Sequence, residues 1–312
     1  MDSIQNNIDI THFSNFKTPA KTEYYFEINT KEDIEKLSEV YSFSTKKNKR
    51  ILFIWWWTNL LFGFEVFQWI IIKNNLKGWN YDNQTQILQS YSNDSIRKIA
   101  QVLEVDDGQD LWHRFIGLPG SIWGAVFGNA WCFGLEIENN FLSAEVFDMY
   151  EGRRKTLYKN DMDFSYRTSI LKKESPRYFL MSCKFDLSEK KEKYHSDIDN
   201  IYFREHKQPK GNSCGSFFKN PKVDLDLFFQ THKGLERWQL KSMSAWFLIE
   251  NSGLKWYKIW WAFLSEKHAN FLMSDGETCT HKDLLDLIAL TQKEVKKNFW
   301  IELENEVRII TN

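Results

Sequence analysis

Residues 24–29 read YYFEIN and residues 50–54 read RILFI, and the chain between them has the pattern of a helix. Aromatic and aliphatic side chains dominate both runs, which predicts a strand in each. Thr30 followed three residues later by Asp33 is a helix N-cap signal, and we expect this helix to run to about Val40. A strand, a helix and a second strand in so short a stretch indicate a mixed α and β fold and argue against an all-β one.

The second of these strands opens a long apolar stretch that must be tested as a membrane span. Residues 51–72 read ILFIWWWTNLLFGFEVFQWIII, and 22 residues is close to the length that crosses a bilayer. Thr58, Asn59, Glu65 and Gln68 interrupt this stretch, and a glutamate in the middle of a bilayer is costly. A transmembrane helix is therefore the less favoured alternative.

Further along, the apolar pattern predicts helices and strands around a central irregular stretch. Residues 115–138 are rich in small residues and have neither a helical nor a strand period, which is typical of a loop that lines a ligand. Residues 205–212, EHKQPKGN, mark a candidate domain boundary. Helices are expected at 94–102, 242–252 and 281–299, and short strands at 141–147, 153–158 and 179–187.

Composition indicates an ordinary globular chain. It has 312 residues, 42% apolar and 27% charged, and a formal net charge of −1. Such a balance gives no support to nucleic-acid binding or to an acidic membrane surface. The four cysteines form no CxxC pair and the histidines show no metal-ligand spacing, so we expect a reducing compartment and no metal. The polar first ten residues lack the features of a signal peptide, which favours a cytoplasmic protein.

Tryptophan is unusually frequent and glycine unusually rare. Each occurs 14 times, although glycine usually makes up about 7% of a chain. Trp55, Trp56 and Trp57 directly follow a predicted strand and precede Thr-Asn, where a phosphate cradle would need the positive φ that glycine adopts. Trp123 and Trp131 likewise interrupt runs of small residues. Bulky rings therefore stand where small residues are expected.

With glycine read at these places, the chain resembles the UDP-N-acetylenolpyruvoylglucosamine reductase (MurB) family. No single matching segment is decisive, but six in the family's order, covering nearly the whole chain, are specific. The six are ILFIWWWTNLLF at 51–62, GLPGSIWGAVFGNAWCFG at 117–134, YRTS at 166–169, GNSCGSFFKNP at 211–221, GLKWYKIWWAFLSEKHANF at 253–271 and IELENEVRII at 301–310.

Eleven tryptophans lie at or near positions where this resemblance expects glycine. Exchanging them raises glycine from 14 to 25 and lowers tryptophan from 14 to three, which makes both frequencies ordinary. We interpret them as UGA codons, which some bacterial lineages read as glycine, translated as tryptophan. The alternative is genuine tryptophan that forms an aromatic core or a sugar-stacking surface. The eleven are Trp55, Trp56, Trp57, Trp69, Trp123, Trp131, Trp246, Trp256, Trp260, Trp261 and Trp300.

The resemblance implies an α+β flavoprotein. Residues 1–200 would form an FAD-binding domain of the vanillyl-alcohol-oxidase (PCMH) type with two α+β lobes, and residues 201–312 a smaller α+β substrate domain. The last strand, at about 301–310, would contribute a catalytic glutamate. The implied protein is a monomeric cytoplasmic oxidoreductase that acts on a small molecule and binds neither nucleic acid nor membrane.

The implied reaction belongs to peptidoglycan precursor synthesis, and thus to cell-wall biogenesis, cell shape and division. NADPH would reduce FAD, and the flavin would pass hydride to the enolpyruvyl ether of UDP-N-acetylglucosamine to give UDP-N-acetylmuramate. Another oxidoreductase on the same FAD scaffold is one alternative. If the tryptophans are genuine, a non-catalytic aromatic-rich binding protein or a degraded relative without flavin is the other.

Three residues take catalytic roles by resemblance. Ser216 matches the proton donor, and Arg167 matches an arginine whose guanidinium suits a carboxylate and a developing enolate. Glu306 matches the catalytic glutamate, with Glu304 as the competing assignment.

The resemblance also implies ligand contacts. His268 is as compatible with a hydrogen-bonded structural histidine as with a ligand contact. Substrate contacts are expected from Tyr166, Lys219, Asn220, His268 and Arg308. Contacts to FAD are expected from Trp55, Trp56, Trp57, Thr58, Asn59, Leu60, Leu118, Pro119, Gly120, Ser121, Trp123, Gly124, Ala125, Asn129, Gly134 and Ile137, and those near 55–59 and in 117–134 depend on glycine at the tryptophan positions.

Overall fold

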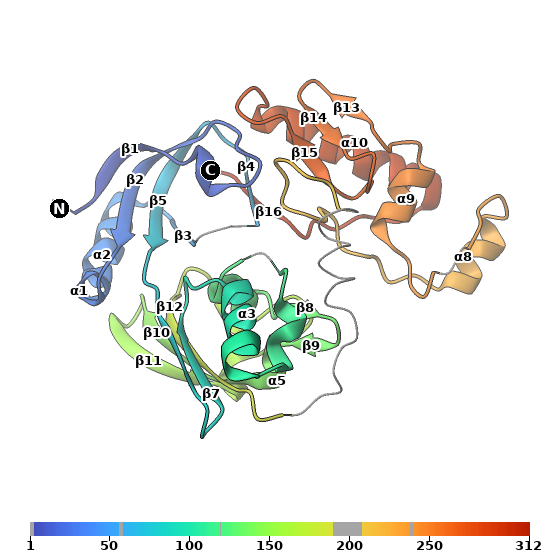
Figure 1. Ribbon diagram of the computed structural model, residues 1–312. Helices are drawn as coiled ribbons and strands as arrows, with labels where there is room; N and C mark the ends of the chain where they lie inside the picture. The colour runs from blue at the N-terminus through green and yellow to red at the C-terminus, as the bar shows by residue number, and fades with distance from the viewer. Residues whose placement is uncertain (1–2, 56–58, 119, 190–207, 238–239) are drawn as a thin grey trace. The chain divides into compact units, whose positions relative to one another are not determined.

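The chain divides into two compact units, which are described here separately. A computed structural model describes residues 3–55, 59–118, 120–189, 208–237 and 240–312 (Figure 1). The two units interleave along the chain, and the single boundary expected near residue 200 remains a prediction. The first unit comprises Met1–Ile8, Lys21–Thr58 and Val66–Glu205, and the second comprises Asp9–Ala20, Asn59–Glu65 and His206–Asn312.

A four-stranded sheet begins the first unit. Both β2 and β3 pair in parallel with β5, so the two ends of the apolar stretch 51–72 are strands of one sheet. Its interpretation as a transmembrane helix is wrong for this reason. Among the described residues, the structure contains no helix that is long and apolar enough to span a bilayer. The strand order is β1 (Gln5–Asp9), β2 (Lys21–Ile28), β5 (Val66–Asn74) and β3 (Ile51–Ile54).

The helix expected after Thr30 is present as two consecutive helices, α1 (Lys31–Glu35) and α2 (Leu37–Lys47). Thr30 Oγ1 accepts a hydrogen bond from the Asp33 N–H at 3.3 Å, as the N-cap signal predicts. The helical path continues beyond the expected end at Val40, and a left-handed Asn48 terminates it.

A five-stranded antiparallel sheet forms the rest of the first unit's framework (Figure 1). The helix α3 (Ile96–Asp107) places Ile99 and Leu103 in the same buried cluster as Leu88 of this sheet. The expected helix at 94–102 is therefore confirmed, with a later end. The strand order is β11 (Arg153–Tyr158), β10 (Phe141–Asp148), β12 (Tyr178–Asp186), β7 (Ile87–Tyr91) and β6 (Trp79–Asp82).

The central stretch 115–138 has more regular structure than the sequence predicts. Ser121 caps the short helix α4, with its Oγ accepting from the Gly124 N–H at 3.4 Å, so the expectation of a plain loop is wrong. A run of small residues shows no clear hydrophobic period, because few of its side chains are large enough to distinguish a buried face of a helix from an exposed one. The elements here are η2 (Leu111–Phe115), α4 (Ile122–Phe127), β8 (Trp131–Cys132), β9 (Leu135–Glu136) and α5 (Ile137–Asn140), and η3 (Lys159–Met162) and α6 (Ile170–Lys173) follow β11.

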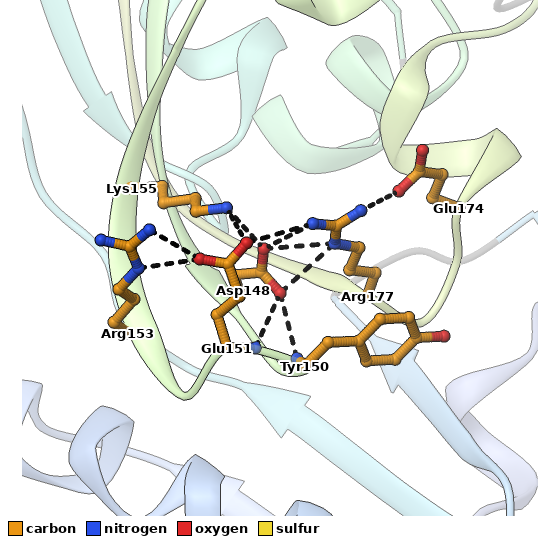
Figure 2. Close-up of polar contacts among 7 residues, drawn as sticks. All are labelled: Asp148, Tyr150, Glu151, Arg153, Lys155, Glu174 and Arg177. Carbon is orange, nitrogen blue, oxygen red and sulfur yellow. Dashed lines mark hydrogen bonds and ion pairs between the residues drawn. The ribbon is translucent and has the colours of Figure 1, made fainter.

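A buried carboxylate at the end of β10 contacts a lysine of β11 and the arginine that directly precedes β12 (Figure 2). Asp148, at the end of β10, has a fully buried side chain that lies 3.0 Å from Lys155 Nζ and 3.1 Å from Arg177 Nη2. It also accepts the Tyr150 N–H at 3.0 Å. Burial alone would raise the pKa of Asp148, but the hydrogen bonds from Arg177 and Lys155 outweigh it and lower the pKa.

The second unit is a small α+β body. Its parallel pair β4–β16 joins segments that are 248 residues apart in register, Leu60 with Arg308, so this part of the core closes only when the chain end is in place. The helix α10 matches the expected 281–299 at both ends. The elements are η1 (Thr11–Phe13), β4 (Leu60–Phe62), α8 (Leu225–Thr231), α9 (Ala245–Asn251), β13 (Lys258–Ile259), β14 (Ala262–Leu264), β15 (Leu272–Ser274), α10 (His281–Phe299) and β16 (Arg308–Ile310).

Candidate functional site

Ser216 and Glu306 are held by one short backbone segment of the second unit. Ser216 forms an isolated bridge with Phe271 on one side. On the other side, the Phe217 carbonyl accepts the Glu306 N–H at 2.8 Å. Gly215 precedes Ser216 at φ +85°, a conformation that L side chains rarely adopt. The serine and the glutamate therefore lie one residue apart across this pairing, and both side chains are half-buried.

Asn270 fixes this segment, and sequence analysis missed it. Its Nδ2 donates to the Phe218 carbonyl at 2.8 Å, and its Oδ1 accepts the Phe218 N–H at 2.9 Å. Its own carbonyl accepts the Phe217 N–H at 2.8 Å. The side chain is buried, so both bonds are shielded from water. The signal was an asparagine within the apolar end of SEKHANF.

The second-unit geometry separates the two competing glutamates. Glu304 accepts from Lys219 twice, through its carbonyl to the Lys219 N–H at 2.8 Å and through Oε2 to Nζ at 2.9 Å. Its side chain is 75% exposed. Glu306 is the one placed beside the Ser216 segment. Glu304 is therefore engaged with Lys219, whereas Glu306 is held through its backbone next to the Ser216 segment.

The other expected substrate contacts in this unit have defined local partners. Asn220 Oδ1 accepts the Ala245 N–H at 3.0 Å and so holds the start of α9. His268 Nδ1 accepts the Asn270 N–H at 3.3 Å, and burial lowers the pKa of His268 below 6.5. A neutral imidazole at neutral pH can contact a ligand through the opposite nitrogen. Arg308 is exposed on β16, and its N–H donates to the Asn59 carbonyl at 3.1 Å.

Arg167 lies in the first unit, in a tight turn. Ser165 and Thr168 exchange backbone hydrogen bonds of 3.2 and 3.0 Å around it, and Arg167 itself has φ +58°. Asn129 Nδ2 lies 3.4 Å from the Ser165 carbonyl, which docks the turn against the expected cofactor segment. Tyr166 is 61% exposed in the same turn.

The expected cofactor residues divide between the units. In the first unit, Asn129 binds Glu136 Oε2 at 2.8 Å and the Glu138 N–H at 3.1 Å, which shapes the hairpin that follows α4. Leu118, Gly120, Ser121, Gly124, Ala125, Gly134 and Ile137 lie in or beside this region of the chain. Asn59 and Leu60 instead belong to the second unit. Trp56, Trp57, Thr58 and Pro119 lie outside the described residues.

Trp55 and Trp123 form a stacked pair in the core of the first unit. Their ring centroids are 3.6 Å apart and their planes differ by 11°. Trp55 Nε1 donates to Ser92 Oγ at 3.2 Å, and the two tryptophans are only 1% and 8% exposed. Rings at van der Waals distance leave no gap for a third ring. The two indoles therefore do not fit a flavin between them.

Thiols and metals add no second candidate. Burial raises the pKa of Cys214 and of Cys279 to about 12, so both thiols stay protonated at neutral pH. Within the described ranges, no three His, Cys, Asp or Glu residues are grouped so that they could hold a metal ion.

Known proteins share the sequence pattern of this chain. Residues 207–310 match the family model described as UDP-N-acetylenolpyruvoylglucosamine reductase, C-terminal domain. A protein of that reductase name from Petrotoga mobilis is 33% identical over 259 residues, which cover 81% of this chain and 78% of the relative. One from Chlamydia trachomatis is 29% identical over 309 residues, 99% of this chain and 96% of the relative.

The fold has a solved counterpart. The crystal structure of UDP-N-acetylenolpyruvylglucosamine reductase (MurB) from Thermus caldophilus superposes with a TM-score of 0.73 over 99% of both chains, at 21% sequence identity. The expected α+β fold is thereby confirmed.

Proposed function

This chain belongs to the UDP-N-acetylenolpyruvoylglucosamine reductase (MurB) family, and we propose that it reduces the enolpyruvyl ether of UDP-N-acetylglucosamine to UDP-N-acetylmuramate. In this proposal NADPH is the reductant, FAD is the hydride carrier, and the enzyme works as a cytoplasmic monomer in peptidoglycan precursor synthesis. Because the indoles at 55 and 123 do not fit a flavin, only the proton and charge steps are derived from the residues below.

The reaction adds a hydride to the β-carbon and a proton to the α-carbon of the enolpyruvyl group. The α-carbon, next to a carboxylate, carries the negative charge until the proton arrives, so the site needs a proton donor and a source of positive charge. The Ser216 hydroxyl is the donor in our proposal. Its weak acidity requires assistance, and in our proposal Glu306, whose N–H pairs with the Phe217 carbonyl, orients it or restores its proton.

Arg167 provides the positive charge in this proposal. A guanidinium binds a carboxylate through two parallel hydrogen bonds and keeps its charge at any physiological pH. The turn at 165–168 fixes the backbone that carries it, and Lys172 Nζ donates to the Arg167 carbonyl at 2.9 Å. Lys219, held by Glu304, is a second cation for the phosphates or carboxylate of the substrate.

The observation that supports the proposal is the backbone hydrogen bond from the Glu306 N–H to the carbonyl of Phe217, the residue after Ser216. Its test uses protein with glycine at the eleven tryptophan positions and follows the two half-reactions by stopped-flow. Ser216→Ala should leave flavin reduction by NADPH nearly unchanged and should slow reoxidation by the enolpyruvyl UDP-sugar by about 10²- to 10⁴-fold. Ser188→Ala, the same change at an exposed serine of the first unit, should alter neither rate more than slightly.

Equal loss of both half-reactions in Ser216→Ala would remove Ser216 from the donor role. Substrate recognition has a separate test, because it does not need flavin. Calorimetric titration with the enolpyruvyl UDP-sugar should show binding to the chain as written, weakened in Arg308→Ala. Absence of binding to both the tryptophan and the glycine form would contradict the proposed substrate.

A further inference from the structure

Trp300 ends the longest helix in a conformation that favours glycine. It is the C-cap of α10, with φ +59° and ψ 23°, and its N–H donates to the Lys296 carbonyl at 2.9 Å. A left-handed residue at a helix end is usually glycine, because a side chain there meets its own backbone. The indole is 87% exposed, so little packing offsets this strain.

Trp260 occupies the first position of a two-residue hairpin loop. Ile259 of β13 pairs with Ala262 of β14, which leaves Trp260 and Trp261 as the connection. Trp260 has φ +49° and is 76% exposed. Tight hairpins of this length place glycine, asparagine or aspartate where φ is positive. Trp260 is therefore a second, independent position at which the backbone conformation favours glycine over tryptophan.

Trp256 repeats the pattern a third time, with φ +67° and 64% exposure. Eleven non-glycine residues of the described chain have positive φ, and three of them are tryptophans. Asparagine and aspartate are the usual non-glycine residues in this region, and a bulky aromatic residue there is an outlier. Chance placement of genuine tryptophans would not concentrate them at left-handed, solvent-exposed positions.

Trp112 shows how a tryptophan is accommodated elsewhere in the same chain. It is fully buried and makes edge-on contacts with Phe115 and Phe185, at centroid distances of 5.4 and 4.9 Å. Its φ is not positive. Trp112 stands outside the eleven positions singled out by the sequence, whereas Trp256, Trp260 and Trp300 lie among them, so backbone geometry and sequence agree for these four tryptophans.

We propose that positions 256, 260 and 300 are glycine in the protein that its own cell makes. The left-handed backbone at these three exposed positions carries the inference.

The first test reads the gene. UGA codons at these three positions and UGG at Trp112 are the expected result. UGG at Trp256, Trp260 and Trp300 would overturn the proposal, whatever the activity of the protein.

The second test measures stability without flavin or substrate, so it is separate from the proposed function. In urea, Trp300→Gly in the chain as written should lower the unfolding equilibrium constant by roughly two- to tenfold, because the strain at the helix end is relieved. Trp112→Gly is the matched control and should raise that constant by more than about a hundredfold. A Trp300→Gly protein that is less stable than its parent contradicts the proposal, as does a Trp112→Gly protein that is equally stable.

Discussion

The segment around Ser216 and the pair Trp55–Trp123 differ in how well they suit the same proposed reaction. Around Ser216, Gly215 supplies the left-handed backbone, Asn270 clamps the neighbouring residue, and Glu306 pairs with Phe217. At Trp55 and Trp123, two indoles fill the interior of the first unit. The first region keeps the serine and the glutamate of the proposed reaction, whereas in the second region tryptophan fills the place where the proposal expects glycine.

This difference argues against a decayed enzyme. Loss of selection would change residues of many kinds, including the serine, the arginine and the glutamate. Here the departures share one amino acid, and three of the described ones lie at positive φ. A single change of decoding accounts for all of them and leaves the chemical residues untouched. The predictions below test each side of this comparison.

Arg167 should give the largest effect on catalysis. In protein with glycine at the eleven positions, Arg167→Ala should lower kcat/KM for the enolpyruvyl UDP-sugar by about 10³-fold, because the developing charge loses its cation. Arg167→Lys should recover only part of this, since an ammonium lacks the planar fork. Steady-state kinetics measures both, with the exposed Arg153→Ala as the control. Full activity in Arg167→Ala would show that the turn at 165–168 does not contribute to catalysis.

Asp148 should give the largest loss of stability outside both regions. Asp148→Asn leaves Lys155 and Arg177 without their shared buried carboxylate and should cost about 3 kcal/mol in urea unfolding. Asp226→Asn, which removes an exposed ion pair with Arg237, should change stability little. Comparable losses in the two variants would contradict the structural role assigned to Asp148.

The same carboxylate predicts a pH dependence. Because the folded pKa of Asp148 is lowered, its contribution to stability is complete above its unfolded pKa of about 3.9 and is lost as pH falls through the lower folded pKa. The difference in unfolding free energy between the parent and Asp148→Asn should therefore shrink in acid. A difference that stays constant down to the acid transition would contradict this linkage.

Asn270→Ala should give a smaller loss of stability than Asp148→Asn, and it should also slow one half-reaction. Asn270→Ala leaves the buried Phe218 N–H and carbonyl without their side-chain partners and should cost about 2 kcal/mol. It should also slow flavin reoxidation more than flavin reduction by NADPH, since it positions the Ser216 segment. Asn83→Ala, at an exposed asparagine, is the control. Unchanged reoxidation at full folding would leave Asn270 a purely structural residue.

His268 should give the smallest effect. Burial lowers the pKa of His268 in the folded protein, so the unfolded chain binds its proton more readily and stability falls as pH drops below about 6.5. We expect less than about 1 kcal/mol between pH 7.5 and 5.5, measured as the difference between the parent and His268→Gln. Parent and variant curves that run parallel across this range would contradict a neutral, buried imidazole.

Elements with strong local signals were predictable from the sequence. The capping box at Thr280 and the apolar face of 281–299 delimit α10, and Thr30 with Asp33 marks the start of α1. The elements within residues 115–138 were not predictable, because their small side chains show no hydrophobic period. The clearest local signal for α4 is its N-cap, Ser121. The β4–β16 pairing joins residues 248 positions apart in the sequence, and no local pattern encodes it.

The candidate site was predictable in its residue types but not in its supports. Resemblance supplied Ser216, Arg167 and Glu306, whereas the clamp from Asn270 and the use of Asn220 at the start of α9 depend on tertiary contacts. The competition between Glu304 and Glu306 could be weighed only once the Lys219 ion pair was located. The positive φ of Trp256, Trp260 and Trp300 is likewise a backbone property that a sequence cannot display.

The visible absorption spectrum of the chain with glycine at the eleven positions tests the central claim most directly. The account predicts a flavin band near 450 nm, roughly the general position for flavins, that NADPH bleaches and the enolpyruvyl UDP-sugar restores. The chain as written, purified in parallel with added FAD, should show no such band. A folded glycine form that remains colourless in the presence of FAD would contradict the account.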